Sequence, residues 1–132
     1  MLRGLCASLA GLALVLSAQA ALAAARVPSR IGECTRTTIR EIGHRLEDGF
    51  THVPMIDSGS AVTFANGLYQ VSYEELPVIH RARRGDPVLI CLVSLPTDCP
   101  KGDDRGKVYK TTDLRTRQSW TLPDAEHSCG GA

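Results

Sequence analysis

The chain has 132 residues, with 15 basic side chains, 14 acidic side chains and five cysteines. Arg3 is the one charged residue before position 26, so removing it from the 15 basic residues leaves 14, equal to the 14 acidic residues. This balance argues against bulk binding of residues 26–132 to nucleic acid. A chain of this length is expected to form one domain with a modest core.

Residues 1–25 show the three regions of a secretory signal peptide. Arg3 supplies the positive charge, residues 5–16 form an apolar segment, and the alanines from Ala18 to Ala25 fit a small-residue cleavage site. The apolar segment is shorter than the roughly 20 residues of a membrane-spanning helix. We therefore expect residues 1–25 to be cleaved and residues 26–132 to be a single exported β domain, periplasmic or secreted, without a stable membrane span.

The first predicted element covers residues 34–46, where two patterns compete. Ile39, Ile42 and Leu46 follow a helical spacing, whereas a run of threonines favours a strand and Gly43 interrupts a helix. We predict a strand with a bulge near Gly43. Residues 47–60 then read as a loop, because glycine, proline, aspartate and serine are frequent there.

A β-hairpin is the clearest local prediction. Val62 and Phe64 share one face of a strand at 61–64, and Tyr69, Val71 and Tyr73 share one face of a returning strand at 68–73. Asn66-Gly67 between them is a pair typical of tight hairpin turns of type I′. Residues 74–84 then fit a short helix with Pro77 near its start.

Residues 88–95 are the one long aliphatic run outside the N-terminus, and Pro87 and Pro96 flank them. Eight residues, almost all of them apolar, between turn signals predict a central strand buried on both faces. Two more strands are expected at 108–114 and 119–122. The sequence thus predicts an all-β fold, a small disulfide-bonded barrel or sandwich of about six short strands with at most one short helix.

Four cysteines remain after cleavage, namely Cys34, Cys91, Cys99 and Cys129. An even number in a small exported chain predicts two disulfides, and the sequence alone allows three pairings. We favour Cys91–Cys99, which closes a short loop after the central strand, and Cys34–Cys129, which ties the ends of the domain. A zinc site is the alternative, but His127-x-Cys129 is the one closely spaced pair of ligand residues. We expect no metal and no cofactor.

Motifs for catalysis are weak in this sequence. A Gly-x-Ser-x-Gly motif is missing, and oxidised cysteines cannot act as thiolate nucleophiles. Asp98, Asp103 and Asp104 lie in one glycine-rich loop, where turn formation explains them without a calcium ion. Asp103 or Asp104 together with a nearby histidine is the pair that a small hydrolase would use.

Much of the chain after position 58 resembles small exported proteins of Gram-negative bacteria that have no assigned function. The resemblance is carried by residues 66–67, 71–73, 85–88, 91–94, 99–100, 102–106 and 120–124. It implies a location in the bacterial envelope and adds no chemistry.

A shorter stretch is similar to the periplasmic C-type lysozyme inhibitors. It consists of Ser58-Gly59-Ser60-Ala61-Val62-Thr63-Phe64 followed by Gly67-Leu68-Tyr69. Those inhibitors are small disulfide-bonded β-barrels whose serine- and glycine-rich hairpin enters the lysozyme cleft, so the resemblance implies that Ser58 and Ser60 contact the target. Ala61 stands where that motif usually has glycine.

The sequence therefore favours a non-enzymatic exported binding module of the bacterial envelope, with a lysozyme-type glycosidase as the most concrete target. A structural or stress-resistance protein without a dedicated site is one alternative, and a small envelope hydrolase is another.

Overall fold

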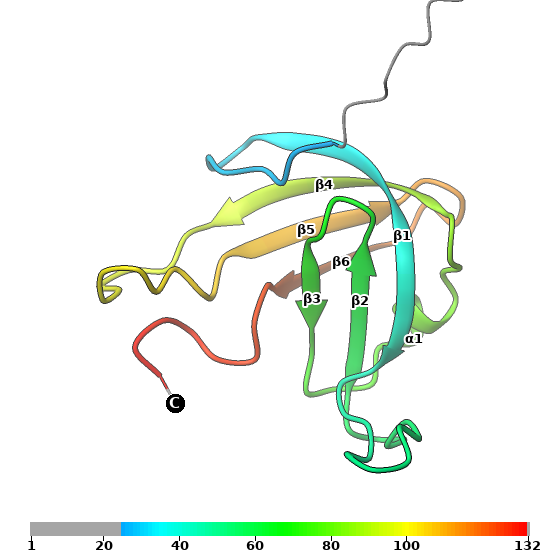
Figure 1. The fold of residues 1–132 in the computed structure, drawn as a ribbon. Helices are drawn as coiled ribbons and strands as arrows, with labels where there is room; N and C mark the ends of the chain where they lie inside the picture. Colours follow the sequence, from blue (N-terminus) through cyan, green and yellow to red (C-terminus); the bar gives the residue numbers. More distant parts are fainter. Residues whose placement is uncertain (1–24, 132) are drawn as a thin grey trace, which may run out of the picture.

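A computed structural model describes residues 25–131, which form six antiparallel strands and one short helix (Figure 1). In chain order these are β1 (Cys34–His44), β2 (Ser60–Phe64), β3 (Tyr69–Val71), α1 (Pro77–His80), β4 (Pro87–Ser94), β5 (Val108–Asp113) and β6 (Ser119–Pro123). The strands form one sheet, in the order β3-β2-β1-β4-β5-β6, that curls into a half-barrel. The predicted all-β class is confirmed. The predicted signal peptide lies outside the described residues, apart from Ala25.

Strand β1 is long and bent, and it belongs to both halves of the sheet (Figure 1). Its first part pairs with β4, from Cys34 opposite Cys91 to Thr38 opposite Pro87, and its second part pairs with β2. Between Ile39 and Glu41 the register shifts by one residue, so Arg40 is the extra residue of a bulge. A bulge bends and twists a strand. The expected bulge therefore exists, but it lies three residues before Gly43.

The predicted β2–β3 hairpin is present, but its turn differs from the expected one. The Gly67 N–H donates to the Phe64 carbonyl oxygen at 3.0 Å, and the Phe64 N–H donates to the Leu68 carbonyl oxygen at 2.9 Å. Gly67 has a φ of 88°, whereas Asn66 does not have a positive φ. These contacts describe a three-residue loop that ends in a glycine bulge. The expected type I′ turn, which needs a positive φ at both residues, is wrong.

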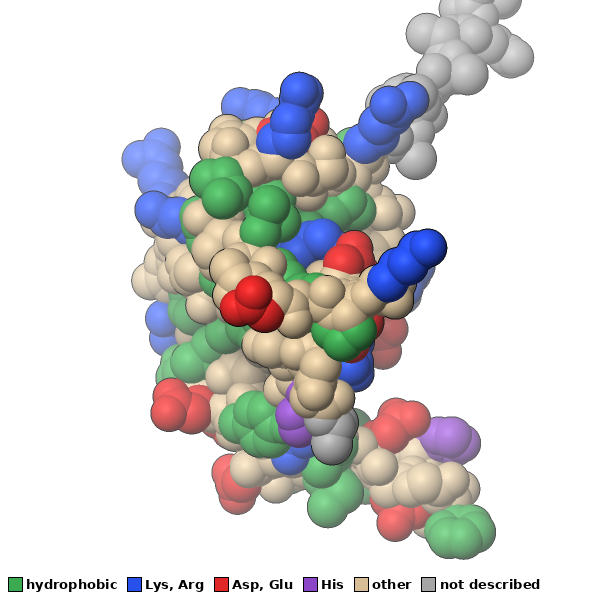
Figure 2. Space-filling view, turned by 90° about the vertical axis from the view of Figure 1, so that its left-hand side faces the viewer, with side chains coloured by type: hydrophobic (Ala, Val, Ile, Leu, Met, Phe, Trp, Pro, Cys, Tyr) green, Lys and Arg blue, Asp and Glu red, His purple; other side chains and the backbone are tan. Residues whose placement is uncertain are grey.

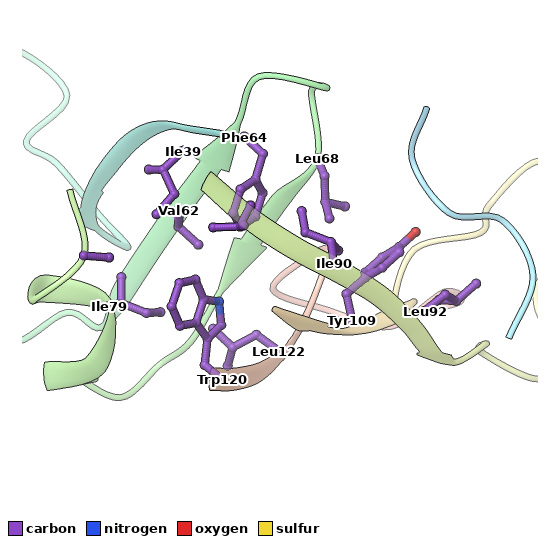
Figure 3. Packing of buried hydrophobic residues seen from close by; sticks show 12 residues of the cluster. Ile39, Val62, Phe64, Leu68, Ile79, Ile90, Leu92, Tyr109, Trp120 and Leu122 are labelled. Carbon is purple, nitrogen blue, oxygen red and sulfur yellow. The ribbon is translucent and has the colours of Figure 1, made fainter. Parts of the chain in front are cut away.

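The core fills the concave side of the half-barrel (Figure 3). Buried side chains come from all six strands, from α1 and from the loops next to them. The largest apolar ones are Ile39, Phe64, Leu68, Ile79, Ile90, Leu92, Tyr109, Trp120 and Leu122. On β4 the side chains of Val88, Ile90 and Leu92 are buried, whereas Val93 is exposed. Strand β4 does lie inside the sheet as predicted, but the expectation that both its faces are buried is wrong.

The short helix α1 begins at Pro77, as the sequence predicted, and its Ile79 side chain faces Trp120 in the core (Figure 3). The turn after α1 is held by Asp86, which is buried. Asp86 accepts hydrogen bonds from the Arg83 N–H and from Nε of Arg115, both at 2.7 Å. The Arg115 guanidinium holds the pKa of Asp86 below its usual value. This ion pair joins the α1–β4 turn to the β5–β6 turn.

Four cysteines form two disulfides, but the favoured pairing is wrong. The structure contains Cys34–Cys91, with Cα atoms 4.0 Å apart, and Cys99–Cys129, with Cα atoms 5.2 Å apart. Cys34 and Cys91 lie directly opposite each other on β1 and β4, where cross-strand side chains are close enough to bond. The chain continues away from Cys91 at about 3.3 Å per residue to the end of β4. Cys99 then lies on a loop that meets the C-terminal segment.

Peptide mapping without reduction tests this pairing. We expect one linked peptide pair containing Cys34 and Cys91 and a second containing Cys99 and Cys129. A Cys91–Cys99 or Cys34–Cys129 pair as the main species would contradict the strand register, because the sheet places Cys34 opposite Cys91.

Candidate functional site

The segment between β1 and β2, residues 45–59, extends beyond the end of the sheet, and we call it the projecting loop (Figure 1). Among the described residues, nine large hydrophobic side chains are exposed, and five of them lie in this loop. They are Phe50, Ile56, Val53, Met55 and Leu46. Phe50 is 96% exposed and Ile56 is 74% exposed. Figure 2 shows the loop as a lobe at the bottom of the molecule that carries hydrophobic, acidic and histidine side chains. Apolar side chains gathered at one exposed place indicate an interaction site.

The backbone of the projecting loop is held by its own hydrogen bonds. Glu47 and Pro54 pair across the loop in an isolated antiparallel bridge. At the tip, Oδ1 of Asp48 accepts hydrogen bonds from the N–H groups of Phe50 and Thr51, at 3.0 and 2.8 Å. The bonds from Thr51 and Phe50 lower the pKa of Asp48, because they stabilise the charged carboxylate. An aspartate that binds nearby N–H groups in this way fixes a turn, and Phe50 is therefore presented on a defined backbone.

The base of the projecting loop is braced by Arg45 and the C-terminal segment. Nε of Arg45 donates to the Ser58 carbonyl oxygen at 2.7 Å, and Nη1 pairs with Oε2 of Glu126 at 3.0 Å. The guanidinium also lies 4.3 Å from the ring centroid of Tyr73, within the range of a cation–π contact. The Cys99–Cys129 disulfide anchors the segment that carries Glu126. The C-terminal segment therefore holds the base of the projecting loop through the Arg45–Glu126 ion pair.

The two serines that the sequence singled out lie at the end of this loop. Oγ of Ser58 accepts a hydrogen bond from the Leu46 N–H at 3.0 Å. Ser60 has no exposed surface, and its Oγ accepts a hydrogen bond from the Leu76 N–H at 2.7 Å. A partner could reach Ser60 only if the groups that contact its hydroxyl, among them Glu75 and His80, moved away. The contact roles of Ser58 and Ser60 both stay predictions.

A cluster of two histidines and a glutamate lies at the base of the projecting loop. His44 is the last residue of β1, Glu75 precedes α1, and His80 is the last residue of α1. Nδ1 of His44 is 2.7 Å from Oε1 of Glu75, and Nε2 of His80 is 2.6 Å from Oε2. The hydrogen bond from His44 is the largest cause that lowers the pKa of Glu75. No sequence motif points to this cluster, because 31 positions separate His44 from Glu75.

The acidic loop after β4 is neutralised by its own basic residues. Asp103 pairs with Nε of Arg105 at 2.8 Å, and this guanidinium holds the pKa of Asp103 well below its usual range. Asp104 pairs with Lys107. In the described part of the chain, the ion pairs between a carboxylate and a histidine involve Glu75 and Glu47 rather than Asp103 or Asp104. The structure thus does not bring together the acid–base pair that the hydrolase alternative named.

Comparisons with protein-family models, with curated proteins and with solved structures found no match to this chain. The resemblances to small exported bacterial proteins and to lysozyme inhibitors therefore stay predictions. Within residues 25–131, the structure has no helix of the length and apolarity needed to cross a membrane. The site must be interpreted from its own geometry.

Gly59 allows the projecting loop to rejoin the sheet. It has a φ of 114°, and a Cβ at this position would overlap the carbonyl oxygen of Ser72. Gly49 provides a matched control in the same loop, because a Cβ there would meet no atom within 4 Å and the residue has no positive φ.

We expect Gly59→Ala to lower the free energy of unfolding by more than about 2 kcal/mol, from backbone strain and overlap together. Gly49→Ala should change it by less than about 0.5 kcal/mol, as is usual for an exposed site. Urea unfolding of both variants measures the difference. Equal midpoints for the two variants would contradict the close packing of Gly59 against the Ser72 carbonyl oxygen.

Proposed function

We propose that this protein is a non-enzymatic exported binding module whose projecting loop enters a cleft of another exported protein. The observation that carries the proposal is the exposure of Phe50, 96%, at the tip of a loop held by internal hydrogen bonds. Folding alone gives no reason to place a large aromatic side chain in water beside several other apolar ones. Burial in a partner does give such a reason.

A braced loop is suited to this role because ordering a flexible segment weakens binding. Immobilising side chains and loops on association costs free energy, and a segment that is already fixed avoids much of that cost. The Asp48 cap at the tip and the Arg45 contacts at the base supply this order. An aromatic side chain that fills a pocket is the usual centre of binding energy in an interface.

Charges near the apolar tip indicate what kind of cleft would fit. The loop carries three acidic residues, Glu47, Asp48 and Asp57, against Arg45 as its one basic residue apart from histidine. Arg45 is engaged with Glu126 at the base. A partner with an apolar pocket and a positively charged rim would therefore be complementary to the loop.

The class of partner is inferred from the expected location, periplasmic or secreted, and from the resemblance of residues 58–69 to lysozyme inhibitors. Two disulfides suit an oxidising compartment such as the periplasm or the medium. A lysozyme-type glycosidase is the most concrete target in such a compartment. Ser58, at the end of the loop, would contact the rim of its cleft, and Phe50 would enter the cleft.

Inhibition of a purified C-type lysozyme acting on bacterial cell walls tests the named target. We expect saturable inhibition by the disulfide-bonded protein and a loss of at least about tenfold in affinity for Phe50→Ser, which removes the central aromatic contact. Ile31→Ser is the matched control, because Ile31 is 63% exposed and lies outside the loop. Inhibition that is equal for both variants would contradict the role of the loop.

Should lysozyme not be inhibited, photo-crosslinking in intact cells separates the target from the mode of binding. A photo-reactive phenylalanine analogue replaces Phe50 in one variant and Ile31 in the other. A discrete crosslinked protein formed from position 50 alone supports the binding module and identifies its partner. Identical patterns from both positions would contradict the proposal and favour a structural protein without a dedicated site.

A further inference from the structure

We propose that His44, Glu75 and His80 form a binding site for a divalent transition-metal ion, with Zn²⁺ as the best fit. Each residue offers one ligand atom, and these atoms lie within 4.8 Å of one another. The inference is independent of the binding role proposed for the projecting loop, although the site lies at the base of that loop.

The ligand atoms come from three places that the fold brings together. His44 ends β1, His80 ends α1, and Glu75 lies in the connection between β3 and α1. The two imidazole rings lie side by side, with centroids 5.2 Å apart, and the Glu75 carboxylate contacts Nδ1 of one and Nε2 of the other. Both rings therefore turn a nitrogen toward the same carboxylate, which brings three ligand atoms near one another as a shared ion requires.

Neighbouring groups hold the carboxylate in this position. The Gly59 N–H donates to Oε1 of Glu75 at 3.3 Å. Oγ of Ser60 lies 3.5 Å from Oε2 of Glu75 and 3.0 Å from Nε2 of His80. Ser60 is itself fixed, because its Oγ accepts the Leu76 N–H. The contacts from Gly59 and Ser60 to the carboxylate are of the kind that orient ligands in metal sites. The contact between Ser60 and Nε2 of His80 must give way when that nitrogen binds the ion.

The ligand types favour zinc or a similar ion over calcium or magnesium. Two imidazole nitrogens and one carboxylate oxygen match Zn²⁺ with three protein ligands, whereas Ca²⁺ and Mg²⁺ prefer oxygen alone. The side chains of His44, Glu75 and His80 are 24%, 28% and 33% exposed. A solvent molecule can therefore supply the fourth ligand.

Only small movements are needed for binding. Ligand atoms of a tetrahedral zinc ion are about 3.3 Å apart, given Zn–N and Zn–O distances of about 2.0–2.1 Å. The histidine–glutamate contacts of 2.6 and 2.7 Å must open slightly, and the wider separations, up to 4.8 Å, must close. Partly exposed side chains can make these adjustments by rotation. The ion would replace the imidazole protons that now bridge to the carboxylate.

The chain contains a matched control for this site. His52 and Glu47 also form a histidine–glutamate contact, with Nδ1 of His52 3.0 Å from Oε1 of Glu47. That pair is far more exposed, at 73% and 60%, and has no third ligand in the described residues. It should not hold an ion on its own.

Calorimetric titration of the purified, disulfide-bonded, metal-free protein with Zn²⁺ tests the proposal. We expect saturable binding of one ion per chain, a rise in the unfolding temperature with Zn²⁺ and no comparable effect of Mg²⁺ or Ca²⁺. Loss of an outer-shell partner costs about 10–100-fold in metal affinity, so His80→Ala and His44→Ala, which lose a direct ligand, should weaken binding at least 100-fold. His52→Ala should leave it unchanged.

Two further measurements keep the test decisive. Glu75→Gln preserves the size of the side chain and should also weaken Zn²⁺ binding, while the circular dichroism of each metal-free variant shows that it is folded. The visible absorption of bound Co²⁺ should report four-coordination in the wild type. Absence of one-to-one Zn²⁺ binding, or equal loss of affinity in His52→Ala and His80→Ala, would overturn the proposed site.

Discussion

The half-barrel depends on one buried side chain, that of Gln70 on β3. Strands β3 and β6 are the two edges of the sheet, and its curl brings them into contact. Nε2 of Gln70 donates to the carbonyl oxygens of Tyr109 and Leu122, at 2.8 and 3.0 Å, and its Oε1 accepts from Thr111 and Trp120. Two donor bonds and two acceptor bonds satisfy the amide completely. A buried polar network of this kind specifies one arrangement of the strands.

The position of the candidate site follows from this closure. With Gln70 bonded to β5 and β6, the β2–β3 hairpin stays against the core, and the chain after β3 leads into α1 beneath it. This path brings Glu75 and His80 to His44 at the end of β1. The same end of the sheet carries the projecting loop, whose base is held by Arg45 and Glu126. The projecting loop and the histidine cluster therefore lie at the same end of the sheet.

The sequence predicted what depends on local patterns and missed what depends on distant contacts. Alternation and turn residues identified the β2–β3 hairpin, and Pro77 marked the start of α1. Gln70 gave no such signal, because its partners lie 39 to 52 positions away. The disulfide pairing failed for the same reason, since it follows from the register of β1 on β4. The projecting loop was recognised as a loop, but the exposure of Phe50 required the structure.

Equilibrium unfolding of Gln70→Met tests the closure most directly, since methionine keeps the shape of glutamine and removes its hydrogen bonds. Leaving several buried groups without partners should lower the free energy of unfolding by at least about 2 kcal/mol. Gln118→Met is the matched control, because Gln118 is exposed and accepts hydrogen bonds from Arg81, and its loss should cost less than about 0.5 kcal/mol. A Gln70→Met protein as stable as the wild type would contradict the account, because the edges of the half-barrel would then be held by packing alone.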